Sequence, residues 1–303
     1  MPIKPELLRT TMLTGIAGIS LSANSAGAGD LLKSAPPPLM ISAPAVDGPN
    51  ATIEGFGGTL ANKAVAGSKG ALTVPLGGQF GAQVDGAWGI FDRRSFRAAA
   101  GHLFWRDPAI GLLGVYGSHT WWSRFGGVRL SQIGGETEYY WQRFTLQAVA
   151  GVEFGNSGRS IRAITFAGFP VQSFNIDTRF FDRVNLAYYL TDDWKAYVGH
   201  RYLGGRHALA LSSEFGLPLG RGVMAAAYVE GRISGGDHNG VWGGLRVYFG
   251  QNDKPLIDRN RMDDPISWSP DTLFSIVNST NQSFIPRRPD TVLTGSGGGS
   301  GGE

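Results

Sequence analysis

Polar and apolar residues alternate along most of the chain between residues 51 and 250. In residues 143 to 154 one face carries Phe, Leu, Ala, Ala, Val and Phe, whereas the other carries Arg, Thr, Gln, Val, Gly and Glu. Residues 184 to 190 and residues 244 to 249 repeat the pattern. Because successive side chains of a β-strand point to opposite faces, the alternation predicts strands with one apolar and one polar face.

The predicted strands are about ten residues long, which suits a tilted crossing of a bilayer and is about twice the usual length in soluble proteins. We expect short turns to alternate with longer links, the latter including residues 62 to 69, 91 to 95 and 204 to 207. The predicted fold is all-β: a single transmembrane antiparallel up-and-down β-barrel of about 12 strands, or of 10 if residues 77 to 90 merge with a neighbour. The 12 strands are expected at residues 51 to 61, 70 to 76, 79 to 90, 96 to 106, 110 to 122, 130 to 141, 143 to 154, 181 to 191, 194 to 203, 208 to 219, 222 to 234 and 240 to 249.

The two ends of the chain differ from this middle region. Residues 1 to 28 predict a signal peptide, with a basic start, a weakly apolar stretch and small residues for cleavage; a disordered cytoplasmic segment is the alternative. Residues 29 to 50 are rich in Pro and predict a periplasmic linker. Residues 251 to 303 lose the alternation, and we expect a periplasmic tail that ends in a flexible Gly/Ser run. No later window holds the ~20 apolar residues of a membrane helix, so a membrane crossing requires a closed barrel over residues 51 to 250.

Charged residues lie in the middle of the predicted strands, on their polar faces. If the apolar faces meet lipid, these charges line the lumen. They then either form a transverse field that orients small solutes or pair with one another and fill the barrel. The predicted lumen residues are Glu54, Asp85, Arg97, Glu136, Glu138, Arg143, Glu153, Lys195, Arg201, Glu214, Glu230, Arg232 and Arg246.

Residues 244 to 249 resemble the terminal signal that outer-membrane proteins present to the barrel assembly machinery. Residues 101 to 108, 199 to 205 and 242 to 250 are similar to alphaproteobacterial porin-like outer-membrane proteins of unassigned role. The resemblance covers about residues 51 to 268. It implies a β-barrel in the outer membrane of a Gram-negative cell, both termini in the periplasm, and contact with the assembly machinery through Gly244, Val247 and Phe249.

The function that fits these features best is a narrow porin-like passive channel for small polar or anionic solutes. The alternative is a closed structural or surface-interaction barrel, and an outer-membrane lipid hydrolase is a third hypothesis. Residues 155 to 180 form a long link that either constricts the lumen or lies exposed. Basic residues in the outer loops suggest contact with outer-membrane lipid and the phosphates of lipopolysaccharide. No nucleic-acid partner is expected.

Catalytic and metal-binding signals are weak. The chain has no Cys, which excludes a disulfide, a thiolate metal site and a Cys nucleophile. A hydrolase would need a Ser and a His within hydrogen-bond reach. No metal-binding motif is present, so neither an enzyme activity nor a cofactor is expected. The candidates for a Ser–His pair are His102, His119, His200, His207 and His238 with Ser118, Ser212 and Ser213.

Overall fold

The computed structural model describes residues 43 to 286, apart from residues 125, 158 to 159, 162 to 167, 236 to 237, 264, 269 to 270 and 279. The predicted signal peptide and the Gly/Ser run lie outside the described residues, as does most of the predicted linker.

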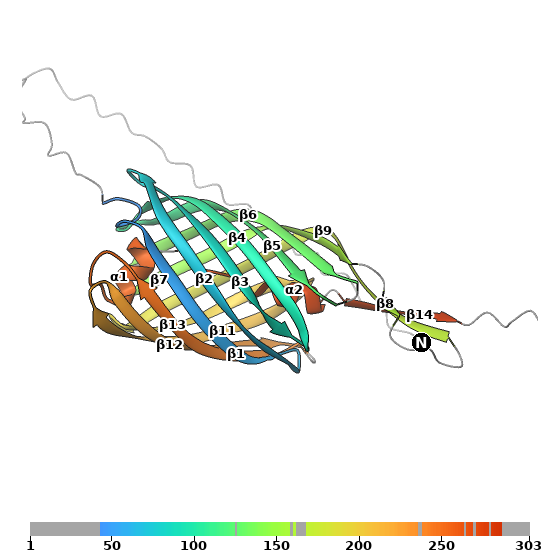
Figure 1. The fold of residues 1–303 in the computed structure, drawn as a ribbon. Coiled ribbons are helices and arrows are strands. Elements are labelled where there is room, and N and C mark those ends of the chain that lie inside the picture. The colour runs from blue at the N-terminus through green and yellow to red at the C-terminus, as the bar shows by residue number, and fades with distance from the viewer. Residues whose placement is uncertain are drawn as a thin grey trace, which may run out of the picture. The chain divides into compact units, whose positions relative to one another are not determined.

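Twelve strands form a closed antiparallel barrel, as the sequence predicts (Figure 1). Each wall strand pairs with the next wall strand along the chain. The barrel closes where β13 pairs with β1, from Phe249 opposite Ala51 to Gly240 opposite Leu60. The wall strands are β1 (Asn50–Leu60), β2 (Lys63–Gly77), β3 (Phe80–Phe91), β4 (Arg94–Asp107), β5 (Gly111–Trp122), β6 (Val128–Trp141), β7 (Phe144–Ser157), β9 (Gly168–Thr191), β10 (Trp194–Leu203), β11 (Arg206–Gly220), β12 (Val223–Ser234) and β13 (Gly240–Phe249).

The direction of the first and last wall strands distinguishes the two ends of the barrel. We call the end at which β1 begins and β13 ends the base, and the opposite end the rim. Three rim links that we predicted to be long are two-residue turns: Ala61 with Asn62, Asp92 with Arg93, and Gly204 with Gly205. All these residues have a positive φ, from 48° to 75°, as tight hairpin turns require. The prediction was wrong because charged residues that suggested loops belong to strands that continue as far as the rim.

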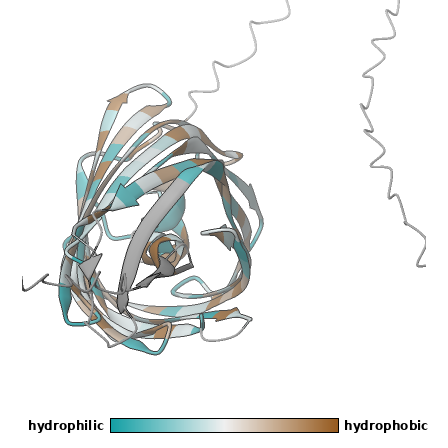
Figure 2. Ribbon diagram, turned by 90° about the vertical axis from the view of Figure 1, so that its right-hand side faces the viewer, coloured by the Kyte–Doolittle hydropathy of each residue, from teal (hydrophilic) through white to brown (hydrophobic). Residues whose placement is uncertain are grey.

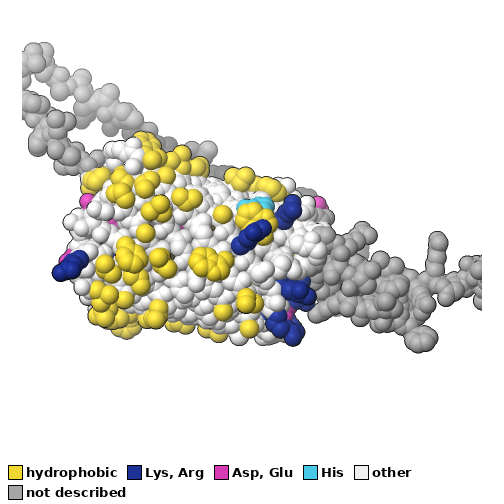
Figure 3. Space-filling model, in the orientation of Figure 1, with side chains coloured by type: hydrophobic (Ala, Val, Ile, Leu, Met, Phe, Trp, Pro, Cys, Tyr) yellow, Lys and Arg dark blue, Asp and Glu magenta, His cyan; other side chains and the backbone are white. Residues whose placement is uncertain are grey.

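The wall has an apolar exterior. Along β3 the outward side chains of Phe80, Val84, Trp88 and Ile90 are all more than half exposed. From Phe80 to Ile90 the strand rises roughly 33 Å, which is about 25 Å across a membrane at a tilt of about 40°. Figure 3 shows apolar side chains spread over this face, with charged ones near its two ends. The exterior therefore matches the apolar band of a bilayer.

Two short helices and two further strands complete the described fold. Helices α1 (Leu256–Met262) and α2 (Asp271–Asn278) follow the last wall strand. Figure 2 shows helix within the ring of strands. Strands β8 (Ser160–Ile161) and β14 (Thr280–Pro286) pair with residues 168 to 174 of β9, a part of that strand that does not pair with the wall strand β7. Neither α1 nor α2, the helices of the described residues, is long and apolar enough to cross a membrane.

Candidate functional site

The barrel interior is polar and densely connected. Most of the residues that the sequence predicts for the lumen are buried or partly buried on the inward face of the wall. These inward residues are Glu54, Asp85, Glu136, Glu138, Glu153, Lys195, Arg201, Glu214, Glu230, Arg232 and Arg246. Whether they line a conducting pore stays a prediction.

Two of the predicted lumen residues do not face the lumen. On β4 the inward positions are even-numbered, as shown by buried Phe96 and Ala98, so Arg97 between them points outward and is exposed. Arg143 lies on the turn between β6 and β7, where its guanidinium pairs with exposed Asp192 at 2.7 Å. In the first case the face was wrongly assigned, and in the second the residue lies at the base and not in a strand.

The lumen holds a segment of the chain's own C-terminal part, which we call the plug: the described residues of 254 to 278. We had predicted a tail outside the barrel. Instead, the backbone N–H of Ile257 in α1 donates to the carbonyl oxygen of Asp192 at the base. Phe274 in α2 lies against Leu60 and Trp242, near the rim ends of β1 and β13. The plug therefore passes through the lumen from the base toward the rim, and β14 continues the chain to pair with β9.

Asp271, the first residue of α2, is the most strongly held group of the plug. Its two carboxylate oxygens accept hydrogen bonds of 2.7 Å from the Nε atoms of Arg201 and Arg232. The Nε atom of Arg183 lies 4.0 Å away. The Asp271 side chain is 3% exposed and these arginines 2% or less, so the charges are removed from water. Such a cluster is stable only with both signs present, because a buried charge without a partner is costly.

The rest of α2 makes hydrogen bonds to other wall strands. Thr120 of β5 donates a hydrogen bond to Thr272 at 2.9 Å. Ser275 donates to Glu153 of β7 at 2.7 Å, and Gln132 of β6 donates to the same carboxylate at 3.0 Å. Helix α2 is thus connected to the wall strands β5, β7, β10 and β12.

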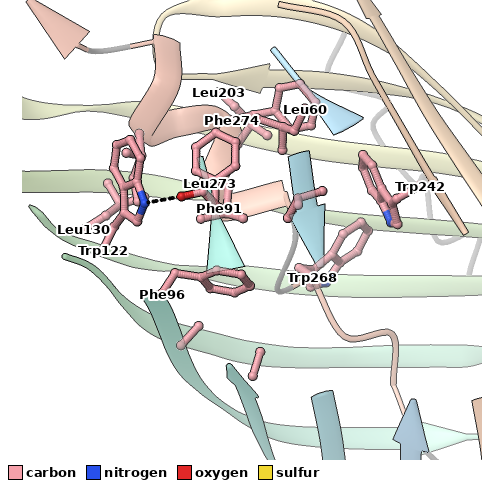
Figure 4. Close-up of a cluster of buried hydrophobic side chains, with 14 of the residues drawn as sticks. Leu60, Phe91, Phe96, Trp122, Leu130, Leu203, Trp242, Trp268, Leu273 and Phe274 are labelled. Carbon is pink, nitrogen blue, oxygen red and sulfur yellow. Dashed lines mark hydrogen bonds between the residues drawn. The ribbon is translucent and has the colours of Figure 1, made fainter. Parts of the chain in front are cut away.

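Apolar side chains of α2 and of the wall form a buried cluster toward the rim (Figure 4). Leu273, Phe274 and Ile276 of α2 are at most 2% exposed. They pack in one buried cluster with wall residues that point inward near the rim. The principal wall residues are Leu60, Phe91, Phe96, Trp122, Leu130, Leu203 and Trp242.

Helix α1 is held at the base by backbone as well as side-chain contacts. Arg259 donates to the carbonyl oxygen of Gly222 at 3.0 Å. Lys254 pairs with Asp47 at 2.9 Å and with Asp263, so the segment before β1 is tied to the plug. Hydrogen bonds from Asn252 and Lys254 lower the pKa of the Asp47 carboxyl below its ordinary value. These ion pairs and hydrogen bonds therefore hold α1 and the segment before β1 together at the base.

Between the two helices, wall charges pair with one another. Arg246 bridges Glu54 at 2.6 Å and Glu214 at 2.8 Å. Lys195 pairs with Glu214 at 3.0 Å and also donates to Asn260 of α1. A cavity of about 40 Å³ lies between this network and the plug, enough for a few waters. Within the described residues, this is the ion-paired filling that the sequence left as one of two alternatives.

Several inward wall residues were not among the predicted lumen residues. Arg183 was missed although it lies in the predicted strand of residues 181 to 191, on the same face as Asn185. His102, predicted as a candidate for hydrolysis, instead lies inward between Asp85 at 3.3 Å and Glu136 at 2.7 Å. Asp271 itself gave no signal, because its partners are 39 and 70 residues away in sequence.

The serine and histidine candidates do not assemble into a catalytic triad in the described residues. No hydrogen bond there joins Ser118, Ser212 or Ser213 to a histidine. His119 instead contacts Ser131 at 2.7 Å on the outer face, without a carboxylate on its second nitrogen. His200 bonds Asp182 at 2.8 Å and His207 at 2.9 Å. The described residues hold no metal-type cluster of His, Asp and Glu.

No protein-family model and no curated protein sequence matches the chain. Among solved structures, an outer-membrane channel from Pseudomonas putida F1 aligns at 9% identity over 71% of this chain and 99% of that one, with a TM-score of 0.44. The KdgM porin aligns at 9% identity over 66% and 98%, with a TM-score of 0.39. The translocator domain of the autotransporter NalP from Neisseria meningitidis aligns at 15% identity over 67% and 87%, with a TM-score of 0.40. By its own closed strand order, apolar exterior and charged interior, the chain has the architecture of a transmembrane β-barrel.

Proposed function

We propose that this barrel is a passive channel for small polar or anionic solutes that its own plug holds closed. The observation that carries the proposal is the position of Asp271. A carboxylate of the plug occupies the place between Arg201 and Arg232 that a solute carboxylate or phosphate would take. When the plug leaves, these guanidinium groups remain on the wall and favour anions.

The contacts of the plug are of a kind that water and solutes can replace. Hydrogen bonds of Thr272 and Ser275, and the ion pairs of Asp271, all have partners that become hydrated once the lumen fills with water. Twelve strands enclose more space than a small filled barrel of eight strands. Displacement of the plug would therefore leave a wetted, charged passage through an otherwise intact wall.

A closed structural barrel is the second candidate, and the filled rim favours it. Leu273 and Ile276 are completely buried, and their apolar contacts are lost if the plug moves. The two functions differ in one respect: a channel requires that the plug moves while the wall stays folded, and a structural barrel does not.

A reversible covalent lock distinguishes them. The hydroxyl oxygens of Thr120 and Thr272 are 2.9 Å apart, and the chain has no native Cys, so the double substitution Thr120→Cys and Thr272→Cys places one thiol pair between wall and plug. We expect single-channel steps in a planar bilayer from the reduced protein and silence from the oxidised protein. The two single-Cys variants serve as controls for the substitutions themselves.

Two outcomes would contradict the channel proposal. Steps from the fully oxidised protein would show that conduction does not need movement of the plug. Silence from reduced and unmodified protein at all voltages, with heat-modifiable gel migration confirming a folded barrel, would favour the structural role.

The proposed location of the chain follows from the same architecture. We place the barrel in the outer membrane with the base in the periplasm. The prediction that both chain ends lie there does not fit the plug, because β14 pairs with the part of β9 that extends beyond the wall at the rim. We keep Gly244, Val247 and Phe249 as the proposed contact with the barrel assembly machinery. The outward, apolar side chains of β13 support this contact, since Leu245 and Phe249 are exposed.

A further inference from the structure

Arginine and tryptophan alternate in a row across four strands on the outer face of the barrel. Trp88 of β3 lies directly opposite Arg97 of β4. Arg97 lies opposite Trp121 of β5, and Trp121 lies opposite Arg129 of β6. All four side chains are on the outward face, so the strand register itself builds an ordered row of indole and guanidinium groups. We call these four residues the Trp–Arg row.

The row lines a groove on the exterior. Its volume is about 590 Å³, and its walls include all four residues of the Trp–Arg row. The guanidinium of Arg97 lies over the ring of Trp121, 5.3 Å from the ring centre. This contact presents the arginine along the surface, where its N–H groups stay available beside the ring.

The two arginines of the row have no acidic partner within the described residues. Other exterior or end-of-barrel arginines do: Arg124 pairs with Asp92, and Arg143 pairs with Asp192. His119, which precedes Trp121 by two positions, adds an imidazole with hydrogen-bonding nitrogens on the same face. Figure 3 shows basic and histidine side chains beside apolar ones toward the rim. The groove is therefore locally cationic.

The depth of the row places it at the edge of the apolar band. Trp88 is four residues before Asp92 in the rim turn, which is roughly 13 Å along the strand. On the side toward the base, the outward residues Val84 and Val115 are apolar and more than half exposed. Tryptophan is enriched at the level of lipid headgroups, and arginine binds phosphate with paired N–H groups.

We propose that the Trp–Arg row is a binding site for a membrane lipid with an anionic phosphate headgroup. Arg97 and Arg129 bind the phosphate from either side of Trp121, and the indoles pack against the adjoining glycerol or acyl region. The hydrogen-bonded pair of His119 and Ser131 lies one step toward the membrane centre, in reach of polar groups below the phosphate. The site belongs to the wall, and it does not depend on whether the plug moves.

Native mass spectrometry of the full chain in detergent, with phosphatidic acid and phosphatidylcholine of identical acyl chains, tests the proposal. We expect the unmodified protein to retain phosphatidic acid in preference to phosphatidylcholine. In the double variant Arg97→Gln and Arg129→Gln, the ratio of bound phosphatidic acid to bound phosphatidylcholine should fall about thirty-fold, as expected for the loss of two cationic side chains at a membrane surface. A matched variant, Arg94→Gln with Arg206→Gln, removes the same charge from exposed positions outside the groove and should retain the preference.

Three results would overturn the proposal. The first is an unchanged preference in the Arg97→Gln and Arg129→Gln variant. The second is an equal loss in the matched variant, which would assign the effect to net charge. The third is displacement of the lipid by glycerol 3-phosphate at equal concentration, because the headgroup alone would then suffice. Heat-modifiable migration of each variant on a gel confirms that the barrel is folded.

Discussion

Replacing Asp271 with asparagine should open the lumen without unfolding the wall. The substitution keeps the size of the side chain but removes the negative charge between Arg201 and Arg232. Removing one partner from a buried ion pair typically costs about 3–5 kcal/mol, because the remaining charges stay buried without a partner. When the plug leaves, water solvates these arginines, so the cost applies to the closed state.

That cost sets the size of the expected effect. Since about 1.36 kcal/mol corresponds to a factor of ten, the ratio of closed to open states should fall by roughly two to four powers of ten. Planar-bilayer recording measures this ratio directly as the open probability of single channels. Asp258→Asn is the matched control, because Asp258 in α1 is exposed and forms no ion pair in the described structure.

The reasoning also predicts how the substitution combines with the covalent lock. Asp271→Asn in the oxidised Thr120→Cys and Thr272→Cys background should be silent, and reduction should restore frequent opening. A folded Asp271→Asn protein that opens no more often than Asp258→Asn would refute the role of the arginine cluster.

Further predictions concern the wall. Leu245 is 70% exposed in the middle of β13, and Leu245→Arg should destabilise the folded barrel in vesicles by about 2–4 kcal/mol. Leu219 lies near the base, and Leu219→Arg should destabilise the barrel by only about 0–1 kcal/mol. Urea titrations that follow the heat-modifiable band measure both free-energy changes. Equal costs would mean that these residues do not sit at different membrane depths. Gly244→Ala should cost about 1–3 kcal/mol in the same titration, because its Cβ would lie 2.1 Å from the Gly55 carbonyl oxygen, whereas Gly86→Ala meets nothing within 4 Å. A Gly244→Ala barrel as stable as Gly86→Ala would show that β1 and β13 pack less closely than described.

The wall could be predicted from the sequence because its signal is local. Alternation along each strand decides which side chains point out, as for Leu146 and Val152 on β7, and strand length decides that the barrel crosses a membrane. Arg97 shows the limit of this reasoning. A charged residue near a strand end can lie on the outward face at headgroup depth, so charge alone does not identify a lumen residue.

The plug could not be predicted because its signal is not local. Its helices have 7 and 8 residues, too few to give a clear period. The polar residues of α2, Asp271, Thr272 and Ser275, are buried against the wall, so they do not form the solvated face of a surface helix. The ion pairs of Asp271 join residues that only the closed barrel brings together. Most of the predicted lumen charges therefore lie on the inward face of the wall, but the segment that neutralises them was not recognised.

The central claim is that the C-terminal segment occupies the lumen of the folded barrel, and cysteine labelling tests it most directly. Ser275→Cys places the protein's single thiol on α2, at a position with 0% exposure, and Asn252→Cys places it on an exposed residue just after β13. In the folded full chain we predict that a maleimide labels residue 275 at least about a hundred-fold more slowly than residue 252, and that unfolding in urea makes the two rates equal. Equal rates in the folded protein would contradict the account, because residue 275 would then lie outside the lumen.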